Sequence, residues 1–159
     1  MLSKAPAPRS VLALDVGRRR IGLAGCDPLG ISVTALPALA RARFGADLEH
    51  LRPLLIRRNV QALVVGLPLD RQGQPTAQSI HCRRYGERLA RALTLPVAWV
   101  NDQASTWAAA ETHGLHGDRS GALDSAAAAL LLQQWLAEGP EPVTVADPRP
   151  DTSGVVGSS

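Results

Sequence analysis

The 159-residue sequence has few aromatic residues, only two cysteines and no long apolar run. Its longest uninterrupted apolar segment, Ala126 to Leu132, is far shorter than the roughly 20 residues that a membrane-spanning helix requires. Near the N-terminus, Asp15 interrupts an apolar stretch before it reaches the length of a signal-peptide core, about 7 to 15 residues. We therefore expect no membrane span and no export, and a cytoplasmic location.

The cysteines and the basic residues give little information about the function. Cys26 and Cys82 stand alone, without the CxxC or CxxH spacing of a zinc site, and isolated thiols suit a reducing compartment. Among the 17 Lys and Arg residues, only Lys4 is a lysine. Arginine is well suited to bidentate contact with phosphate. A GC-rich genome also enriches a sequence in arginine and alanine, so the net charge of +3 does not by itself indicate a nucleic-acid partner.

The two ends of the sequence differ in composition from its middle. Residues 1–9 and 139–159 are rich in Pro, Ala, Gly, Ser and Asp and show no periodicity, so we expect both to be flexible tails. Residues 10–138 are expected to form a single folded domain. The composition of the chain, 45% hydrophobic and 19% charged, is that of an ordinary globular protein.

Apolar periodicity predicts five strands and four helices in this domain. Three strand-length runs come first, joined by turns that contain Gly, Asp and Pro, and helices then alternate with strands. The predicted strands are 11–16, 21–26, 31–36, 60–66 and 96–100, with Pro37 ending the third, and the predicted helices are 46–58, 77–93, 104–113 and 121–136. This order predicts an α/β fold with a five-stranded mixed sheet, three antiparallel meander strands plus two parallel strands, and helices on both faces.

Three aspartates occupy positions where a charge needs a reason. Asp15 lies inside the first predicted strand, Asp102 follows the fifth, and Asp124 lies in the first turn of the last helix. Each has an ordinary explanation: a strand-end Asp bonded to a turn, a helix N-cap, and an acid favoured by the helix dipole. The predicted topology places the first strand at the centre of the sheet, with the fifth strand and the last helix beside its carboxyl end. We therefore expect the three carboxylates to converge.

Converging carboxylates repel one another unless a cation lies between them. Mg²⁺ takes oxygen ligands and keeps positions open for water and phosphate oxygens, and two ions roughly 3.5 to 4 Å apart can clamp a phosphodiester during hydrolysis. Gly17 lets the backbone approach a phosphate, and Arg18 and Arg20 can bind neighbouring phosphates. A solvated hairpin tip explains these arginines equally well. The residues thus favour phosphoryl chemistry that needs no protein nucleophile.

Four blocks of the sequence carry a resemblance to a known family. The block LALDVGRRRIGLAGCDPLGI resembles the opening strand pair of the YqgF/RuvX family of RNase H-like nucleases, described as Holliday-junction resolvases or pre-16S rRNA nucleases. LVVGLPLDRQG resembles the segment after that family's fourth strand, and LDSAAAALLLQQWL resembles its last helix. The remaining block, Asn101-Asp102-Gln103, departs from the family's usual Asp-Glu-Arg. The resemblance covers about residues 10–137.

The resemblance implies an RNase H-like fold and a nuclease that uses Mg²⁺ or Mn²⁺, as a pair of ions, to hydrolyse phosphodiester bonds in structured nucleic acid. It implies that Asp15, Asp102 and Asp124 are the catalytic, metal-binding residues, and that Arg20 and Arg119 contact phosphate. Branched DNA and precursor rRNA both stay open as substrates. Cutting a four-way junction ordinarily needs a homodimer with two sites, whereas trimming an rRNA precursor needs one site.

The sequence leaves two other functions open. Asp102 is one methylene shorter than the family's Glu, and Gln103 lacks the charge of the family's Arg. These changes motivate a catalytically weak nucleic-acid-binding protein that retains the RNase H-like fold. A DxG motif before a basic hairpin also opens sugar kinases and actin-like ATPases, but those proteins enclose a nucleotide between two such domains and this sequence has the length of one.

Overall fold

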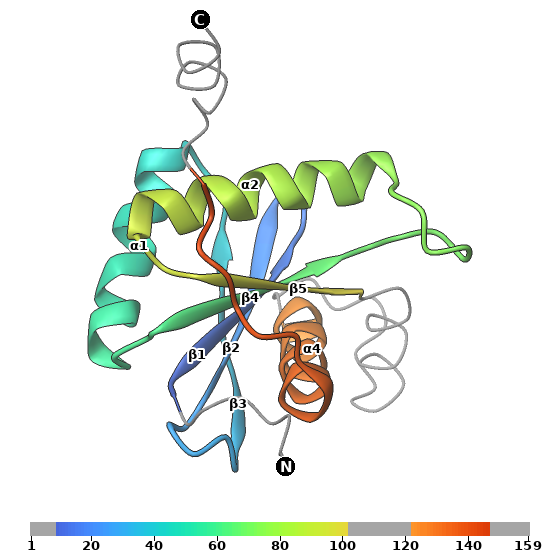
Figure 1. The fold of residues 1–159 in the computed structure, drawn as a ribbon. Coiled ribbons are helices and arrows are strands. Elements are labelled where there is room, and N and C mark those ends of the chain that lie inside the picture. The colour runs from blue at the N-terminus through green and yellow to red at the C-terminus, as the bar shows by residue number, and fades with distance from the viewer. Residues whose placement is uncertain (1–8, 102–121, 147–159) are drawn as a thin grey trace, which may run out of the picture.

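A computed structural model of the chain describes residues 9–101 and 122–146. Its elements are β1 (Val11–Val16), β2 (Arg20–Cys26), β3 (Val33–Ala40), α1 (Phe44–Arg57), β4 (Ala62–Leu67), α2 (Ala77–Leu93), β5 (Val97–Asn101) and α4 (Ala122–Glu138). The strands form one sheet in the order β3-β2-β1-β4-β5 (Figure 1). β1 pairs antiparallel with β2 and parallel with β4, and β5 is parallel to β4, so the predicted mixed sheet with a central first strand is confirmed. The predicted helix 104–113 lies outside the described residues.

Helices cover both faces of this sheet. α1 and α2 pack against one face, and α4 packs against the other (Figure 1). The side chains of β1 alternate between them: Leu12 and Leu14 belong to the core under α1 and α2, whereas Val11 and Ala13 belong to the core under α4. Successive side chains of a strand point to opposite faces. Asp15 therefore lies on the face that α4 covers, the α4 face, and not on the α1–α2 face.

α2 begins and ends at well-defined caps. The Thr76 hydroxyl accepts a hydrogen bond from the Ser79 N–H at 3.0 Å, and the Ser79 hydroxyl accepts one from the Thr76 N–H at 2.7 Å, which together form a capping box. Thr94 ends the helix in the left-handed conformation. The Thr76 hydroxyl also donates to the carbonyl of Pro68 at 2.7 Å, just after β4. The start of α2 is thereby fixed beside the carboxyl end of the parallel strands.

The third strand differs from the prediction that Pro37 ends it. β3 runs through Pro37 and reaches Ala40. Proline lacks a backbone N–H and is tolerated in sheets at an edge or at a bulge. β3 provides both conditions, because it is an edge strand and its register shifts so that Pro37 and Ala38 stand opposite the single residue Gly22 of β2. The prediction was wrong because this tolerance depends on the neighbouring strand.

Residues 139–146, part of the stretch expected to be a flexible tail, pass across β5 after α4 (Figure 1). The Val97 N–H donates to the Val143 carbonyl at 2.9 Å, and the Val143 N–H donates to the Val97 carbonyl at 3.0 Å. Val145 then packs against the core of the α1–α2 face. The domain limits 10–138 stay a prediction. Among residues 9–101 and 122–146, no helix combines the length and the apolar character that crossing a bilayer requires.

Candidate functional site

Asp15 lies near the end of the central strand and is paired with Gly22 of β2. Residues paired across antiparallel strands point to the same face, with Cα atoms about 4.5 to 5.5 Å apart. A Cβ atom added to Gly22 would lie 2.0 Å from the backbone oxygen of Asp124. The backbone at the start of α4 therefore rests directly on Gly22. Asp15 and Asp124, which are far apart in the sequence, are thereby neighbours on the α4 face.

Ser125 anchors this end of α4 to the sheet. Its side chain is buried, and its hydroxyl accepts a hydrogen bond from the Leu23 N–H at 3.3 Å and donates one to the Leu36 carbonyl at 2.5 Å. The hydroxyl thus bridges β2 and β3 next to the bulge at Pro37. Because these contacts hold the backbone, they fix the position of Asp124 relative to β2.

The Asp124 side chain is oriented by Arg20, the first residue of β2. The Arg20 Nε donates a hydrogen bond to the Asp124 Oδ2 at 3.1 Å, and the two side chains keep 36% and 30% of their surface exposed. An ion pair this open to solvent contributes little to the free energy of unfolding. Its effect is to set the direction of the carboxylate at the rim of the site.

The turn between β1 and β2 requires glycine at its first position. The Gly17 N–H donates to the Arg20 carbonyl at 2.9 Å, and a Cβ atom at Gly17 would lie 2.8 Å from that same oxygen. The Gly17 carbonyl accepts a hydrogen bond from the Arg41 guanidinium at 2.7 Å. Packing in the turn thus explains this glycine, and its direct contact with phosphate stays a prediction. Arg18 and Arg19 are exposed at the tip of the turn.

Asp102 and Arg119 lie outside the described residues. β5 ends at Asn101, whose carbonyl accepts a hydrogen bond from the Gln134 side chain at 3.4 Å. Gln134 lies about 15 Å along α4 from Asp124. In the two described ranges, no group of three or more His, Cys, Asp or Glu side chains is arranged to hold a metal ion. The structure therefore brings together two of the three predicted carboxylates, and the place of the third stays a prediction.

A group of basic side chains on the α1–α2 face was not predicted from the sequence. Arg41, His81, Arg84 and Arg88 line a cavity of about 250 Å³. The predicted helix 77–93 contains His81, Arg84 and Arg88. The sequence held no signal that Arg41, which follows β3, would join them, because that contact depends on how the helix packs on the sheet.

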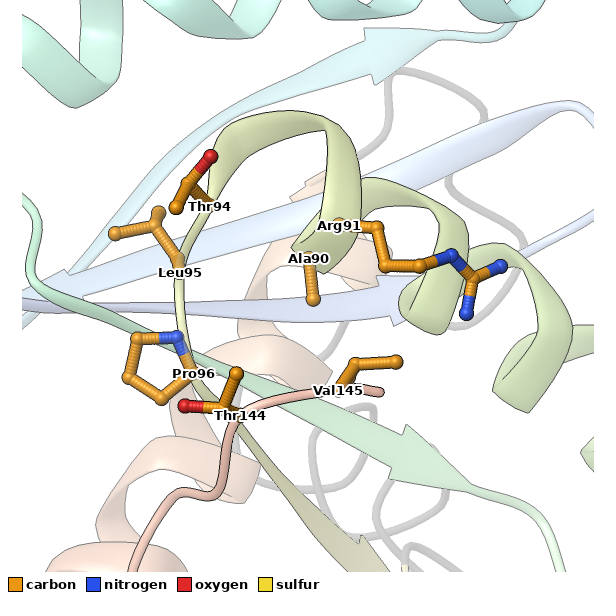
Figure 2. Close-up of a pocket in the computed structure, with 7 residues that line it drawn as sticks. All are labelled: Ala90, Arg91, Thr94, Leu95, Pro96, Thr144 and Val145. Carbon is orange, nitrogen blue, oxygen red and sulfur yellow. The ribbon is translucent and has the colours of Figure 1, made fainter. Parts of the chain in front are cut away.

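Another cavity, of about 330 Å³, lies at the end of the sheet opposite to Asp15 and Asp124 (Figure 2). It is formed by the last turn of α2, the residues that lead into β5, and Thr144 and Val145. Arg91 is the one charged residue in its described lining. This cavity lies at the amino end of β5, whereas Asp15 lies at the carboxyl end of β1, which runs in the same direction. It is therefore separate from the candidate site.

Comparison with known proteins identifies the family of this chain. The RuvX family model, described as "Holliday junction resolvase", matches residues 9–138. The chain belongs to the RuvX family. The resemblance carried by the four sequence blocks is thereby confirmed, and Asp15, Gly22 and Asp124 all fall within the matched region.

Relatives in the RuvX family share high identity with this chain. A protein from Synechococcus sp. (strain CC9605) is 72% identical over 136 residues, which are 86% of this chain and 86% of the relative. A protein from Prochlorococcus marinus (strain MIT 9313) is 62% identical over 148 residues, 92% of each chain. Both carry the name "Putative pre-16S rRNA nuclease".

Among solved structures, the fold of this RuvX family member is similar to that of T. thermophilus RuvC in complex with a Holliday junction substrate. The TM-score is 0.53 at 15% identity, and the match covers 85% of this chain and 99% of that chain. At such low identity the likeness concerns the fold alone. It confirms the predicted RNase H-like fold class.

Proposed function

We propose that this protein is a divalent-metal-dependent nuclease whose active site lies beside Gly22. The observation that carries the proposal is the contact between the start of α4 and Gly22, opposite Asp15. It places Asp15 and Asp124, from two distant segments, on one face at the carboxyl end of the central strand. Membership of the RuvX family and the names of its relatives support hydrolysis of phosphodiester bonds.

The side chains at this position suit a hard divalent cation. Carboxylate oxygens are ligands that Mg²⁺ and Mn²⁺ prefer, and the missing side chain at Gly22 lets the helix come close enough for two carboxylates to share one face. We propose that Asp15 and Asp124 hold such ions and that Asp102 completes the ligand set. When bound, a pair of these ions supplies Lewis-acid stabilisation of the phosphate and lowers the pKa of a bound water.

The other residues of the chain position the acids and the substrate. Arg20 acts as a positioning residue, because it holds the Asp124 carboxylate in one direction. Arg18 is exposed at the tip of the β1–β2 turn and supplies a guanidinium for a phosphate next to the cut. Arg119 is proposed to do the same from the segment before α4. Phosphate binding by Arg18 and Arg119 places the scissile bond against Asp15 and Asp124.

Two substrates are supported by different observations. The names of relatives up to 72% identical favour precursor 16S rRNA, and we propose cleavage at its 5′ end. The description of the family model favours a four-way DNA junction, for which a homodimer would present two sites. An assay panel of four-way junction, duplex DNA, single-stranded DNA and precursor rRNA, each with Mg²⁺ and with Mn²⁺, separates the two. Sedimentation of the protein with and without the junction tests the homodimer.

Replacing each aspartate in turn tests the chemistry. We expect Asp15→Asn and Asp124→Asn each to lower the cleavage rate about a thousandfold or more, because several kcal/mol of transition-state stabilisation is removed, while nucleic-acid binding persists. Glu49→Gln makes the same change of charge at an exposed position on α1 and should cleave at the wild-type rate. Equal cleavage by the wild type and Asp15→Asn would contradict the proposal and indicate a contaminating nuclease. Tight binding without cleavage by the wild type would favour the catalytically weak binding protein.

A further inference from the structure

We infer that a cavity on the α1–α2 face is a second phosphate-binding surface, which grips the backbone of the nucleic-acid substrate away from the cut. This surface, the arginine pocket, consists of Arg41, His81, Arg84 and Arg88 around a cavity of about 250 Å³. It lies between the start of α1 and the outer side of α2. The inference rests on the proposed function, since it takes nucleic acid as the ligand.

The arginine pocket carries mainly positive charge. Among the described residues that line it, Asp47 is the one carboxylate, and it is 2% exposed. Its oxygens are occupied from inside the protein, because Asp47 accepts hydrogen bonds from the Tyr85 hydroxyl at 2.7 Å and from the Ala42 N–H at 2.9 Å. In the described part of the chain, the ion pairs within 4.0 Å involve other arginines. The three guanidiniums of the pocket therefore share a cavity without an acidic partner, and an anionic ligand would relieve their repulsion.

Aromatic rings hold two of these guanidiniums in place without neutralising them. The guanidinium carbon of Arg41 lies 4.4 Å from the centroid of the Tyr85 ring, and that of Arg88 lies 3.9 Å from the centroid of the Phe44 ring. The two rings pack edge to face, with centroids 5.8 Å apart. Burial, and secondly the Asp47 carboxylate, raise the pKa of Tyr85 far above its usual value, so the ring stays neutral. The guanidiniums of Arg41 and Arg88 are thus held in place before a ligand binds, which lowers the entropic cost of binding.

The arginine pocket is connected to the proposed active site through Arg41. The Arg41 Nη1 donates to the Gly17 carbonyl at 2.7 Å and lies 3.0 Å from the His81 Nε2. The backbone N–H of Arg41 donates to the Arg19 carbonyl at 2.8 Å. Arg18 and His81 also line a neighbouring cavity of about 540 Å³ at the start of α2. Positive charge therefore continues from the turn after Asp15 to the pocket, and a strand held at both places crosses the β1–β2 turn.

The chemistry of the pocket points to phosphates. Guanidinium groups match phosphate oxygens bidentately, and contacts of this kind position a nucleic acid without reading its sequence. We therefore expect the pocket to bind DNA and RNA backbones without sequence preference. Its contribution should appear as affinity that falls with salt, because each neutralised phosphate releases counterions.

Binding without divalent ions tests this surface. The full-length protein is titrated into a fluorescein-labelled four-way DNA junction in EDTA, at salt concentrations from 50 to 200 mM. We expect the Arg84→Gln/Arg88→Gln variant to bind about tenfold more weakly, with the slope of log K against log salt reduced by about two, or about one for each lost contact. The control is Arg52→Gln/Arg57→Gln, the same change of charge at exposed positions on α1 away from the pocket. It should keep the wild-type slope.

The possible outcomes separate this inference from the proposed function. If loss of the Arg88 contact with Phe44 unfolds the double variant, Arg84→Gln alone changes an exposed residue and should still reduce the slope by about one. Equal weakening by the two double variants would overturn the inference, because the effect would then come from net charge. A wild type that binds the junction but cleaves no nucleic acid with metal contradicts the proposed function alone. A wild type that cleaves, together with an Arg84→Gln/Arg88→Gln variant of unchanged slope, contradicts the inference alone.

Discussion

α2 and α4 are both 17 residues long, yet they use their surfaces in opposite ways. α4 has two charged residues, Asp124 and Glu138, and its buried residues are apolar except for Ser125. α2 has five charged residues, none of them buried: Arg83, Arg84, Glu87, Arg88 and Arg91. α4 therefore carries an acid at an end that is packed against the sheet, whereas α2 carries its charged side chains on a surface that is not buried.

Residue size explains why α4 can position an acid so closely. Its first turns contain Ser125 and a run of alanines, and they meet the sheet at Gly22. Contact between two backbones leaves little freedom, because neither side can change rotamer. α2 meets side chains of the sheet instead of its backbone, because the atoms nearest to a Cβ added at Gly86 belong to the side chains of Trp99 and Val65. A rigid helix start suits a metal ligand, and an exposed helix side suits phosphate contacts.

Gly22→Ala should have the largest effect on this arrangement. The new methyl group would lie 2.0 Å from the Asp124 carbonyl oxygen, so α4 must move away from β2. We expect the free energy of unfolding to fall by about 3 kcal/mol or more and cleavage to be lost. Gly45→Ala on α1 is the control, because its Cβ would meet nothing within 4 Å and should be neutral or stabilise by up to about 1 kcal/mol. Urea denaturation and cleavage assays measure both, and wild-type stability of Gly22→Ala would show that the close contact is absent in solution.

Removing a hydroxyl near the start of each helix compares α4 with α2 directly. Ser125→Ala leaves the Leu23 N–H and the Leu36 carbonyl without their bridge, and should cost about 1 to 3 kcal/mol and lower the cleavage rate. Ser79→Ala removes one hydroxyl of the α2 capping box and should cost about 1 kcal/mol. Cleavage per folded molecule should be unchanged in Ser79→Ala. If the two variants lose cleavage equally, the start of α4 has no special role in the site.

Arg20→Gln should have the smallest effect on stability, less than about 1 kcal/mol, as should Arg83→Gln. Arg20 orients Asp124, whereas Arg83 pairs with Glu87 at 3.4 Å on the surface of α2. We expect Arg20→Gln to lower kcat about tenfold with little change in KM, since Asp124 loses its fixed direction, and Arg83→Gln to leave both unchanged. Steady-state kinetics decide the role of Arg20. A rise in KM at constant kcat would show that Arg20 contacts phosphate instead of positioning Asp124.

Local patterns in the sequence predicted most of the elements. The described helices and strands other than β3 start and end within two residues of the predicted limits. These elements depend on apolar periodicity and on turn residues that lie next to each other in the chain. The end of β3 could not be predicted in this way, because Pro37 is accommodated by its position on the sheet edge and by the bulge opposite Gly22.

The site also combines features that neighbouring residues determine with features that tertiary contacts determine. By itself, the sequence determined that Asp15 is a candidate, because an aspartate inside an apolar strand needs an explanation wherever it occurs. Only the tertiary structure decided that the start of α4 rests on Gly22 beside Asp15, that Arg20 pairs with Asp124, and that Arg41 joins the arginines of α2. These contacts join residues far apart in the chain, and their strength depends on backbone distances set by the packing of the whole sheet.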